Sequence, residues 1–416
     1  MDLPIKISPD DIELESEDPL DLFYAGIKAK QTKDTLNRTL KKFLLEACEE
    51  ILSGDYKERA KQFVELARTD QRRAVSIIIA YVKQLKKRTM LERTHPNYMN
   101  PSYVPNKIKP IKKLFTMNDV DLPWKRIRMY YPEIDNTHKG RGYTREEIRI
   151  LLEHSNSIET DFIILASSSG GLRIGAWEDQ RWGNIFPVYK VDEQYKLELD
   201  DEEKGQVACA GMIIYKGTRE EYVALFSIEA WEKLQEYKKK WTIKFGRPPK
   251  NDDPLILARY HKPTQLCALS IKEKIEKLVR RAGLRTSLPE GRRRYDVPVT
   301  HGFRRYWDKI MMQTKHSSGT LSSLVIKERL FGHYGLVKTD KNYFWTDTVE
   351  LVPEYLEAMP ELMITEEYRL QKKLEQQIKR NDELEQTLQE KKIEMRRVAE
   401  LEAKIERMQY YNITPQ

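Results

Sequence analysis

Hydrophobic residues recur at three- and four-residue spacing over residues 20–131, and this spacing predicts a bundle of amphipathic helices. Asp70 can cap the second strong helix, and a break containing proline and asparagine precedes the third. The three apolar faces are Leu36, Leu40, Phe43, Leu44, Ala47 and Ile51; Val75, Ile78, Ile79, Val82 and Leu85; and Ile108, Ile111, Leu114 and Phe115. The many lysines and arginines between them fit either the solvated face of an ordinary bundle or a domain that clamps DNA.

A polar segment rich in chain-breaking residues, 132–142, predicts a linker to a second domain over residues 143–363. Its first helix begins at Thr144, with a capping box completed by Glu147. Short apolar runs predict strands at residues 182–188, 208–215 and 222–226, the last two joined as a hairpin with Lys216 at its turn. Helices are predicted again at residues 228–245 and 270–282. The pattern favours a mainly α fold with a small antiparallel β-sheet (α+β).

Residues 364–409 predict one continuous charged helix whose seam alternates steps of four and three residues. The seam runs through Leu370, Leu374, Gln377, Asn381, Leu384, Leu388, Lys391, Met395 and Val398, and then shifts phase to Leu401, Ile405 and Met408. Polar residues in the seam favour a modest coiled coil with a fixed register. A single solvated helix is the alternative. The acidic residues 1–19 and residues 410–416 are expected to be tails.

Composition narrows the class of protein. The chain has 416 residues, which predicts two or three domains, and a formal net charge of +8, which favours a polyanionic partner. Its cysteines, Cys48, Cys209 and Cys267, lack the spacing of metal ligands and are too few for a disulfide framework. No apolar run approaches the roughly 18–20 residues that span a bilayer. We therefore expect a soluble, intracellular protein.

The candidate chemistry concentrates between residues 300 and 345. His301 and Arg304 stand three residues apart and share one face of a predicted helix. A second group, Leu330-Phe331-Gly332-His333, follows, and Tyr343 comes ten residues after His333. Well upstream, two glycines precede Arg173 and permit a tight turn that would direct its guanidinium inward.

These residue types can break a phosphodiester without a metal ion. Tyr343 can act as the nucleophile and form a covalent phosphotyrosine. Arg173 and Arg304 can donate to the non-bridging oxygens of the transition state, because guanidinium groups are permanently charged and bind oxygen pairs in a bidentate manner. Lys216 at the hairpin turn can protonate the leaving 5′ oxygen, although Lys204 lies upstream as a rival.

Histidines complete the predicted site. His301 can exchange the proton of the tyrosine, and His333 can donate a further hydrogen bond to the phosphate. Tyr334 and Tyr355 are rivals of Tyr343, and the spacing from His333 favours Tyr343. We predict no cofactor and no metal ligand.

The order of these groups resembles that of the tyrosine recombinases, also called the phage integrase family. The resemblance rests on Gly171-Leu172-Arg173-Ile174, Lys216 in a hairpin, His301-Gly302-Phe303-Arg304, Leu330-Phe331-Gly332-His333 and Tyr343. It covers residues 144–360 well and extends more loosely to residues 20–131, which look like the family's helical core-binding domain. The long seam and the basic composition suggest an archaeal or mobile-element integrase.

The resemblance implies a site-specific recombinase or integrase that cleaves and rejoins double-stranded DNA through a 3′-phosphotyrosine intermediate, without metal or ATP. It also implies a homo-tetramer on DNA, in which residues 349–363 dock on a neighbouring protomer and the C-terminal helix adds self-association. DNA relaxation like that of type IB topoisomerases and non-catalytic DNA binding by the same fold are the alternatives.

Two positions depart from the family's pattern. Ala176 stands where many members have an acidic residue three places after the first arginine, and Glu178 and Asp179 lie nearby. Arg305 stands where a histidine often follows the second arginine. Neither change removes a catalytic group, but the first leaves open what supports Arg173.

Overall fold

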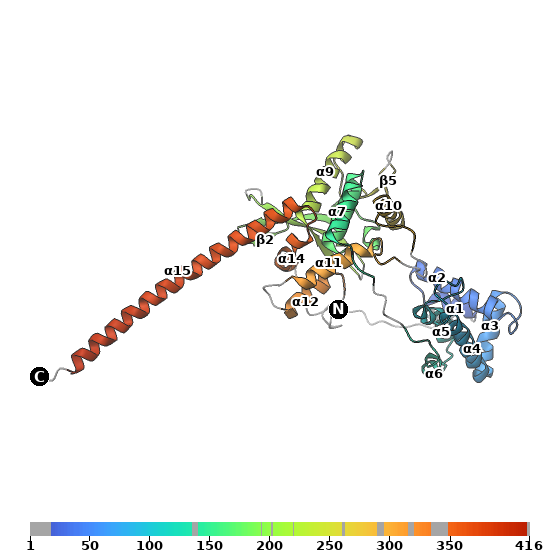
Figure 1. Ribbon diagram of the computed structural model, residues 1–416. Helices are drawn as coiled ribbons and strands as arrows, with labels where there is room; N and C mark the ends of the chain where they lie inside the picture. The colour runs from blue at the N-terminus through green and yellow to red at the C-terminus, as the bar shows by residue number, and fades with distance from the viewer. Residues whose placement is uncertain are drawn as a thin grey trace, which may run out of the picture. The chain divides into compact units, whose positions relative to one another are not determined.

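The computed structural model describes residues 18–134, 140–192, 194–200, 203–218, 220–259, 263–288, 295–314, 320–333 and 348–413. The chain divides into two compact units, Met1–Lys139 with Leu288–Arg294 and Gly140–Ser287 with Tyr295–Gln416 (Figure 1). The predicted nucleophile Tyr343 and its rival Tyr334 lie outside the described residues, as do most of the acidic tail and the last three residues.

The first unit is a helical bundle, as the apolar spacing predicted. Its elements are α1 (Pro19–Ala25), α2 (Lys30–Lys41), the π-helix η2 (Lys42–Ala47), α3 (Tyr56–Thr69), α4 (Gln71–Thr89), η3 (Pro101–Tyr103), α5 (Val104–Met117) and α6 (Trp124–Arg128). Phe63 lies at the centre of the core, with its ring centroid 5.3 Å from that of Phe43 and 5.1 Å from that of Phe115. Aromatic rings from three helices therefore hold the bundle together.

The end of the first predicted helical face is wrong by one residue. Ala47 and Ile51 were expected in the core, but both are exposed, whereas Cys48 and Leu52 are buried. The cause is η2, in which the Cys48 amide donates to the Phe43 carbonyl five residues back. A π-turn adds a residue to the helix and shifts the phase of every later side chain.

The second unit contains a four-stranded antiparallel sheet in the order β2-β1-β3-β4. The strands are β1 (Ile185–Val191), β2 (Gln194–Lys196), β3 (Gln206–Ile214) and β4 (Tyr222–Phe226), and a separate pair joins β5 (Leu257–Arg259) to β6 (Thr264–Gln265). The predicted hairpin is β3–β4, in which Ile214 pairs with Tyr222. Together with the helices, this sheet confirms the predicted α+β class.

Helices surround this sheet and make up most of the second unit. They are α7 (Arg145–Glu153), α8 (Ile158–Gly170), η4 (Ile174–Trp177), η5 (Trp182–Asn184), α9 (Ile228–Phe245), α10 (Ala268–Arg281), α11 (His301–Gln313), α12 (Thr320–Leu330), α14 (Thr348–Leu362) and α15 (Glu366–Ile413). The buried helix α8 packs against α9, α11 and β4. Within the described segments, no helix combines the length and apolarity needed to cross a bilayer.

Helix α14 packs into its own chain, which corrects the expectation that residues 349–363 dock on a neighbouring protomer. Its apolar face is buried in the core of the second unit through Leu351, Val352, Tyr355, Ala358, Met359 and Leu362. The Tyr355 hydroxyl donates to the Ser169 carbonyl at 3.1 Å, and complete burial raises the pKa of Tyr355 well above its usual value. Tyr355 is therefore a packing residue and no rival nucleophile.

Candidate active site

The first arginine lies directly after the C-terminus of α8. Gly171 caps this helix in the left-handed region, at φ 62°, and a Cβ atom on it would lie 2.8 Å from the Trp307 ring. Both constraints require glycine at this position. Arg173 follows in extended conformation and leads into η4. The turn thus places Arg173 beside α11 and α12 instead of extending α8.

Arg304 contacts two of the other predicted catalytic segments, Gly171–Ile174 and Leu330–His333. It lies on α11, is 4% exposed, and donates from Nη1 to the Gly171 carbonyl and from Nη2 to the Phe331 carbonyl, each at 2.6 Å. Its Cζ atom lies 3.3 Å from the centroid of the Phe331 ring. Two backbone hydrogen bonds and this stacked ring hold the guanidinium in one orientation.

The two arginines form a cationic centre in which no carboxylate of the described residues contacts either guanidinium group directly. Burial and the charge of Arg173 lower the pKa of Arg304 to about 10, so the group stays protonated at neutral pH. Arg173 donates from Nη1 to the Gly332 carbonyl at 3.4 Å. Within the described part of the chain, neither arginine forms an ion pair with an acidic side chain. Two guanidinium groups at one place without a direct ion pair are suited to bind an anion.

A backbone carbonyl, and not an acidic side chain at position 176, accepts a hydrogen bond from Arg173. Ala176 is fully buried and offers Arg173 no charge. The nearby Glu178 is engaged elsewhere, because its carboxylate accepts a hydrogen bond from the Ala268 amide at 2.8 Å, at the start of α10. Support for Arg173 therefore comes from the Gly332 carbonyl in the segment Leu330–His333.

His301 is the first residue of α11 and is exposed. Although its side chain reaches solvent, neighbouring atoms desolvate part of the ring, and this desolvation together with the charges of Arg304, Arg305 and Arg173 lowers the pKa of His301. Because a lowered pKa favours the neutral imidazole, His301 is suited to accept a proton near neutral pH.

His333 lies between Arg304 and an acid that sequence reasoning missed. Its Nε2 is 3.3 Å from Arg304 Nη2, and its Nδ1 is 2.9 Å from an oxygen of Glu328. Because arginine only donates, Nε2 must accept, so we assign the proton to Nδ1, which donates to Glu328. Donation from Nε2 to a phosphate, as predicted, would require a second proton, and Glu328 would balance that charge. A separation of five residues matches no helical or strand repeat, so the sequence did not predict that Glu328 contacts His333.

Lys216 lies exposed in the turn of the β3–β4 hairpin. Its neighbour Tyr215 has a positive φ of 54°, and the Tyr215 hydroxyl approaches the Arg173 turn, 3.0 Å from where a Cβ atom on Gly175 would stand. The rival Lys204 precedes the opposite end of β3, a strand of 9 residues that spans about 30 Å. This placement favours Lys216. Among the described residues Lys216 makes no hydrogen bond or ion pair, and its contact with substrate stays a prediction.

Tyr222 is a further residue that sequence reasoning missed. Its ring lies 2.5 Å from where a Cβ atom on Gly332 would stand, so Tyr222 packs against the segment Leu330–His333. Burial raises the pKa of Tyr222, and the nearby Arg304 and Arg173 oppose part of that shift. Its strand position, opposite Ile214 in the hairpin, was predictable, but its closeness to the arginines depends on the packing of α12 on β4.

Replacing Gly171 with alanine is expected to cost more stability than the same change at Gly246. Both glycines end helices in the left-handed region, at φ 62° and φ 67°, which costs a residue with a Cβ atom about 1–2 kcal/mol. Only Gly171 also faces a ring, whereas a Cβ on Gly246 meets nothing within 4 Å. Thermal unfolding should show a fall of about 2–8 °C for Gly246→Ala and about twice as large a fall or more for Gly171→Ala. Equal shifts would contradict the close approach of Trp307.

Comparisons with known proteins come from structure alone. No protein-family model and no curated protein matches the chain. Among solved structures, it is similar to XerA recombinase, with 15% identity over 80% of this chain and 96% of that one and a TM-score of 0.32. It is also similar to the Tn1549 transposon integrase in complex with transposon right-end DNA, with 13% identity over 81% and 98% and a TM-score of 0.44. A lambda integrase dimer bound to a COC′ core site gives 11% identity, 78% and 85% coverage, and a TM-score of 0.37.

The solved structures named above are recombinases or integrases. Their low identity and low TM-scores carry no conclusion about the activity of this chain. Its function is therefore inferred from the arrangement of its own residues. In the described parts of the chain, no group of three or more His, Cys, Asp or Glu side chains could hold a metal ion.

Proposed function

We propose that this chain is a site-specific DNA recombinase or integrase, which cleaves and rejoins double-stranded DNA through a covalent 3′-phosphotyrosine intermediate. The observation that carries the proposal is the pair Arg173 and Arg304, which have no carboxylate partner among the described residues and lie beside His301 and His333. A phosphodiester anion at this centre would relieve the repulsion between the two guanidinium groups. Part of the cost of burying Arg304 would then be recovered when DNA binds.

The proposed reaction consists of two transesterification steps, and each step forms one phosphate ester bond and breaks another. The Tyr343 hydroxyl attacks the phosphorus, His301 takes its proton, and the bond between phosphorus and the 5′ oxygen breaks. Lys216 gives a proton to that oxygen, while Arg173 and Arg304 donate to the non-bridging oxygens. A 5′ hydroxyl of the partner strand then attacks the phosphotyrosine and gives its proton to Lys216, while His301 returns a proton to the Tyr343 oxygen as its bond to phosphorus breaks. One ester bond replaces another at every stage, so ATP is not required, and Arg173 and Arg304 would supply the charge stabilisation for which other enzymes use a metal ion.

The first unit would clamp the duplex. Helices α4 and α5 contain no acidic residue, and α4 ends in a cluster of basic side chains. Lys83, Lys87 and Arg88 are exposed on α4, as are Lys109 and Lys112 on α5. A basic surface without interleaved acids favours phosphate contacts over an ordinary solvated face, on which both signs of charge mix. We infer that four protomers assemble on two duplexes in the cytoplasm and that α15 adds self-association.

The proposal is tested by covalent capture on DNA of unknown target sequence. The probe is a library of nicked duplexes with randomised sequence, in which the fragment released by cleavage diffuses away and traps the adduct. We expect an adduct that resists SDS and whose DNA is attached at a 3′ phosphate. Tyr343→Phe should lower its yield by at least about 1,000-fold, because no other group supplies the nucleophile.

Controls separate the role of Tyr343 from folding and from binding. Tyr334→Phe should keep adduct formation within a few-fold of the wild type, and Tyr343→Phe should keep gel-shift affinity for the selected DNA. An adduct that persists in Tyr343→Phe would contradict the assigned nucleophile. Selected sites placed in pairs should yield recombinant products; strong relaxation of supercoiled DNA without them would favour the topoisomerase alternative.

A further inference from the structure

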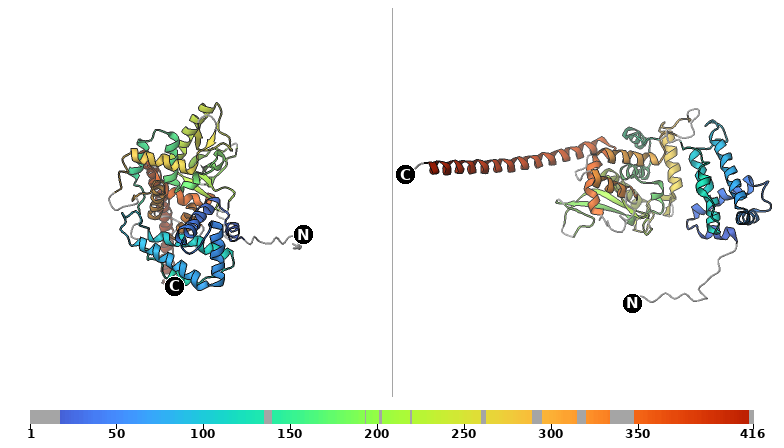
Figure 2. Two further views of the ribbon diagram at one scale, coloured as in Figure 1. Left: turned by 90° about the vertical axis from the view of Figure 1, so that its right-hand side faces the viewer. Right: turned by 90° about the horizontal axis from the view of Figure 1, so that it is seen from below.

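Helix α15 presents an apolar seam that the described residues of its own chain leave exposed. It is one continuous helix of 48 residues (Figure 2). The seam residues Leu370, Leu374, Leu384 and Leu388 are 57–61% exposed, and Met395 is 73% exposed. Isolated helices gain little stability in water, so a helix of this length with exposed leucines at heptad positions indicates a partner helix.

The charges of α15 favour a second copy of the same helix as that partner. Acidic and basic residues occur in equal number along α15, so the helix has no net attraction for DNA or for an anionic membrane. In the heptad that the seam defines, Leu374, Asn381, Leu388 and Met395 occupy position a, and Leu370, Gln377, Leu384, Lys391 and Val398 occupy position d. A helix that is neutral and carries one heptad seam is complementary to itself.

We propose that α15 pairs with α15 of a second copy as a parallel, in-register, two-stranded coiled coil, and that this pairing places two catalytic units side by side. The proposal deepens the assembly part of the proposed function. Asn381 is the first reason, since an asparagine at a single a position pairs with itself in a parallel dimer and fixes the register.

The flanking charges are the second reason for pairing. In the parallel register, Arg380 at position g faces Glu385 at position e of the second copy, an attractive pair that occurs twice. The antiparallel register that keeps Leu374 opposite Val398 would set Glu385 against Glu385, which is repulsive, and Arg380 against Glu394, which is attractive, so the choice of direction rests on Asn381. In the parallel pair Lys391 faces Lys391, and the long side chain can turn its ammonium group to solvent at some cost in stability.

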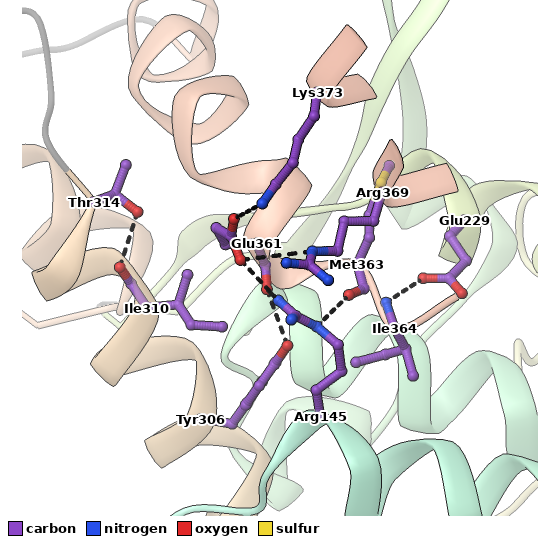
Figure 3. A network of polar contacts seen from close by, with 10 residues as sticks. All are labelled: Arg145, Glu229, Tyr306, Ile310, Thr314, Glu361, Met363, Ile364, Arg369 and Lys373. Atoms are coloured by element: carbon purple, nitrogen blue, oxygen red, sulfur yellow. Dashed lines mark hydrogen bonds and ion pairs between the residues drawn. The ribbon is translucent and has the colours of Figure 1, made fainter. Parts of the chain in front are cut away.

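The junction of α14 and α15 is the third reason, because it fixes the start of α15 to the catalytic unit. Glu361 at the end of α14 binds Arg145 of α7 at 3.0 Å, and Lys373 and Arg369 of α15 also approach its carboxylate (Figure 3). The Tyr306 hydroxyl of α11 donates to the Glu361 carbonyl at 3.0 Å. The helix that carries His301 and Arg304 is therefore connected to the base of α15 through Glu361 of α14.

A second set of contacts completes this junction. The Glu229 carboxylate of α9 accepts hydrogen bonds from the Ile364 and Thr365 amides at 2.9 and 3.0 Å. With the base of each α15 held in this way, a parallel pair brings two catalytic units to the same end of the coiled coil. An antiparallel pair would separate them by up to about 70 Å, the length of 48 helical residues.

Disulfide capture distinguishes the two directions. In a Cys267→Ser background, where Cys48 and Cys209 are buried, Leu374→Cys and Val398→Cys are oxidised separately and as a mixture. A parallel pair forms a disulfide-linked dimer from either variant alone, because each cysteine faces its own copy. Gln386→Cys at the outer position f is the matched control and should remain uncrosslinked. Disulfides that form only between Leu374→Cys and Val398→Cys would overturn the parallel arrangement.

Light scattering on DNA-free protein gives the second measurement. The wild type should be a dimer at micromolar concentration, and Leu384→Lys combined with Leu388→Lys should weaken dimerisation at least about 100-fold, because two buried apolar layers are lost. A monomeric wild type would overturn the proposal. The double variant should still form covalent adducts at single sites, so that failure of dimerisation and failure of the proposed chemistry are separate results.

Discussion

Replacing Arg304 with lysine is expected to slow covalent adduct formation by at least about 100-fold, the cost of losing one preorganised donor to an oxyanion. The structure indicates why the positive charge that lysine retains is not sufficient to replace Arg304. Arg304 uses separate nitrogens to bind the Gly171 and Phe331 carbonyls, and its planar group stacks on Phe331. A lysine has one donor centre and no plane, so it cannot hold both carbonyls and still present a bidentate fork to phosphate.

Arg305→Lys is the matched control for this prediction. Arg305 is the next residue on α11 and is exposed, whereas Arg304 is 4% exposed. Its change should alter the rate of adduct formation less than about tenfold, since it keeps a charge near His301 without disturbing a buried contact. Gel-shift affinity measured on both variants separates DNA binding from chemistry. Comparable losses in the two variants would contradict a special role for Arg304.

Replacing Glu229 with glutamine is expected to loosen the base of α15. The buried carboxylate accepts hydrogen bonds from two backbone amides and from the Thr365 hydroxyl, and glutamine retains only one acceptor oxygen. Losing a charge-assisted hydrogen bond to a buried group costs about 1.5–3 kcal/mol, which corresponds to roughly 10- to 150-fold in the local opening equilibrium. Hydrogen exchange of the Ile364 and Thr365 amides, followed by mass spectrometry, should accelerate by that factor.

Glu232→Gln on the same helix provides the comparison. Glu232 is exposed and binds the Tyr368 hydroxyl, one turn into α15. Exchange at residues 364 and 365 should change less than about threefold in this variant, because exposed polar pairs contribute little to stability. If Glu229→Gln left the exchange of these amides unchanged, Glu229 would not be what holds the start of α15.

Local signals in the sequence determined much of the secondary structure. The capping box of Thr144 and Glu147, the hairpin around Lys216 and the heptad seam of α15 depend on contacts or periods within a few residues. The same holds for the glycine turn before Arg173, because the left-handed conformation at Gly171 follows from the helix end. Such features could be predicted because the chain needs no distant partner to form them.

Two features of the fold could not be read from the sequence: which residues after Lys42 face the core, and which surface covers the apolar face of α14. The π-turn at Lys42–Ala47 places Cys48 instead of Ala47 in the core, and Leu52 instead of Ile51. Helix α14 packs on its own α8 and α11, although its apolar pattern alone fits a neighbouring protomer equally well. Periodicity identifies an apolar face but not the surface that covers it.

For the candidate site, the sequence by itself determined which residue types occur and in what order, including Arg173, His301, Arg304 and His333. Only the tertiary structure decided how they are supported: the Gly171 carbonyl on Arg304 comes from 133 residues away, and the Gly332 carbonyl on Arg173 from 159. These acceptors are backbone atoms that every residue carries. Their position depends on how α8, α11 and α12 pack together, so no pattern of side chains along the chain reveals them.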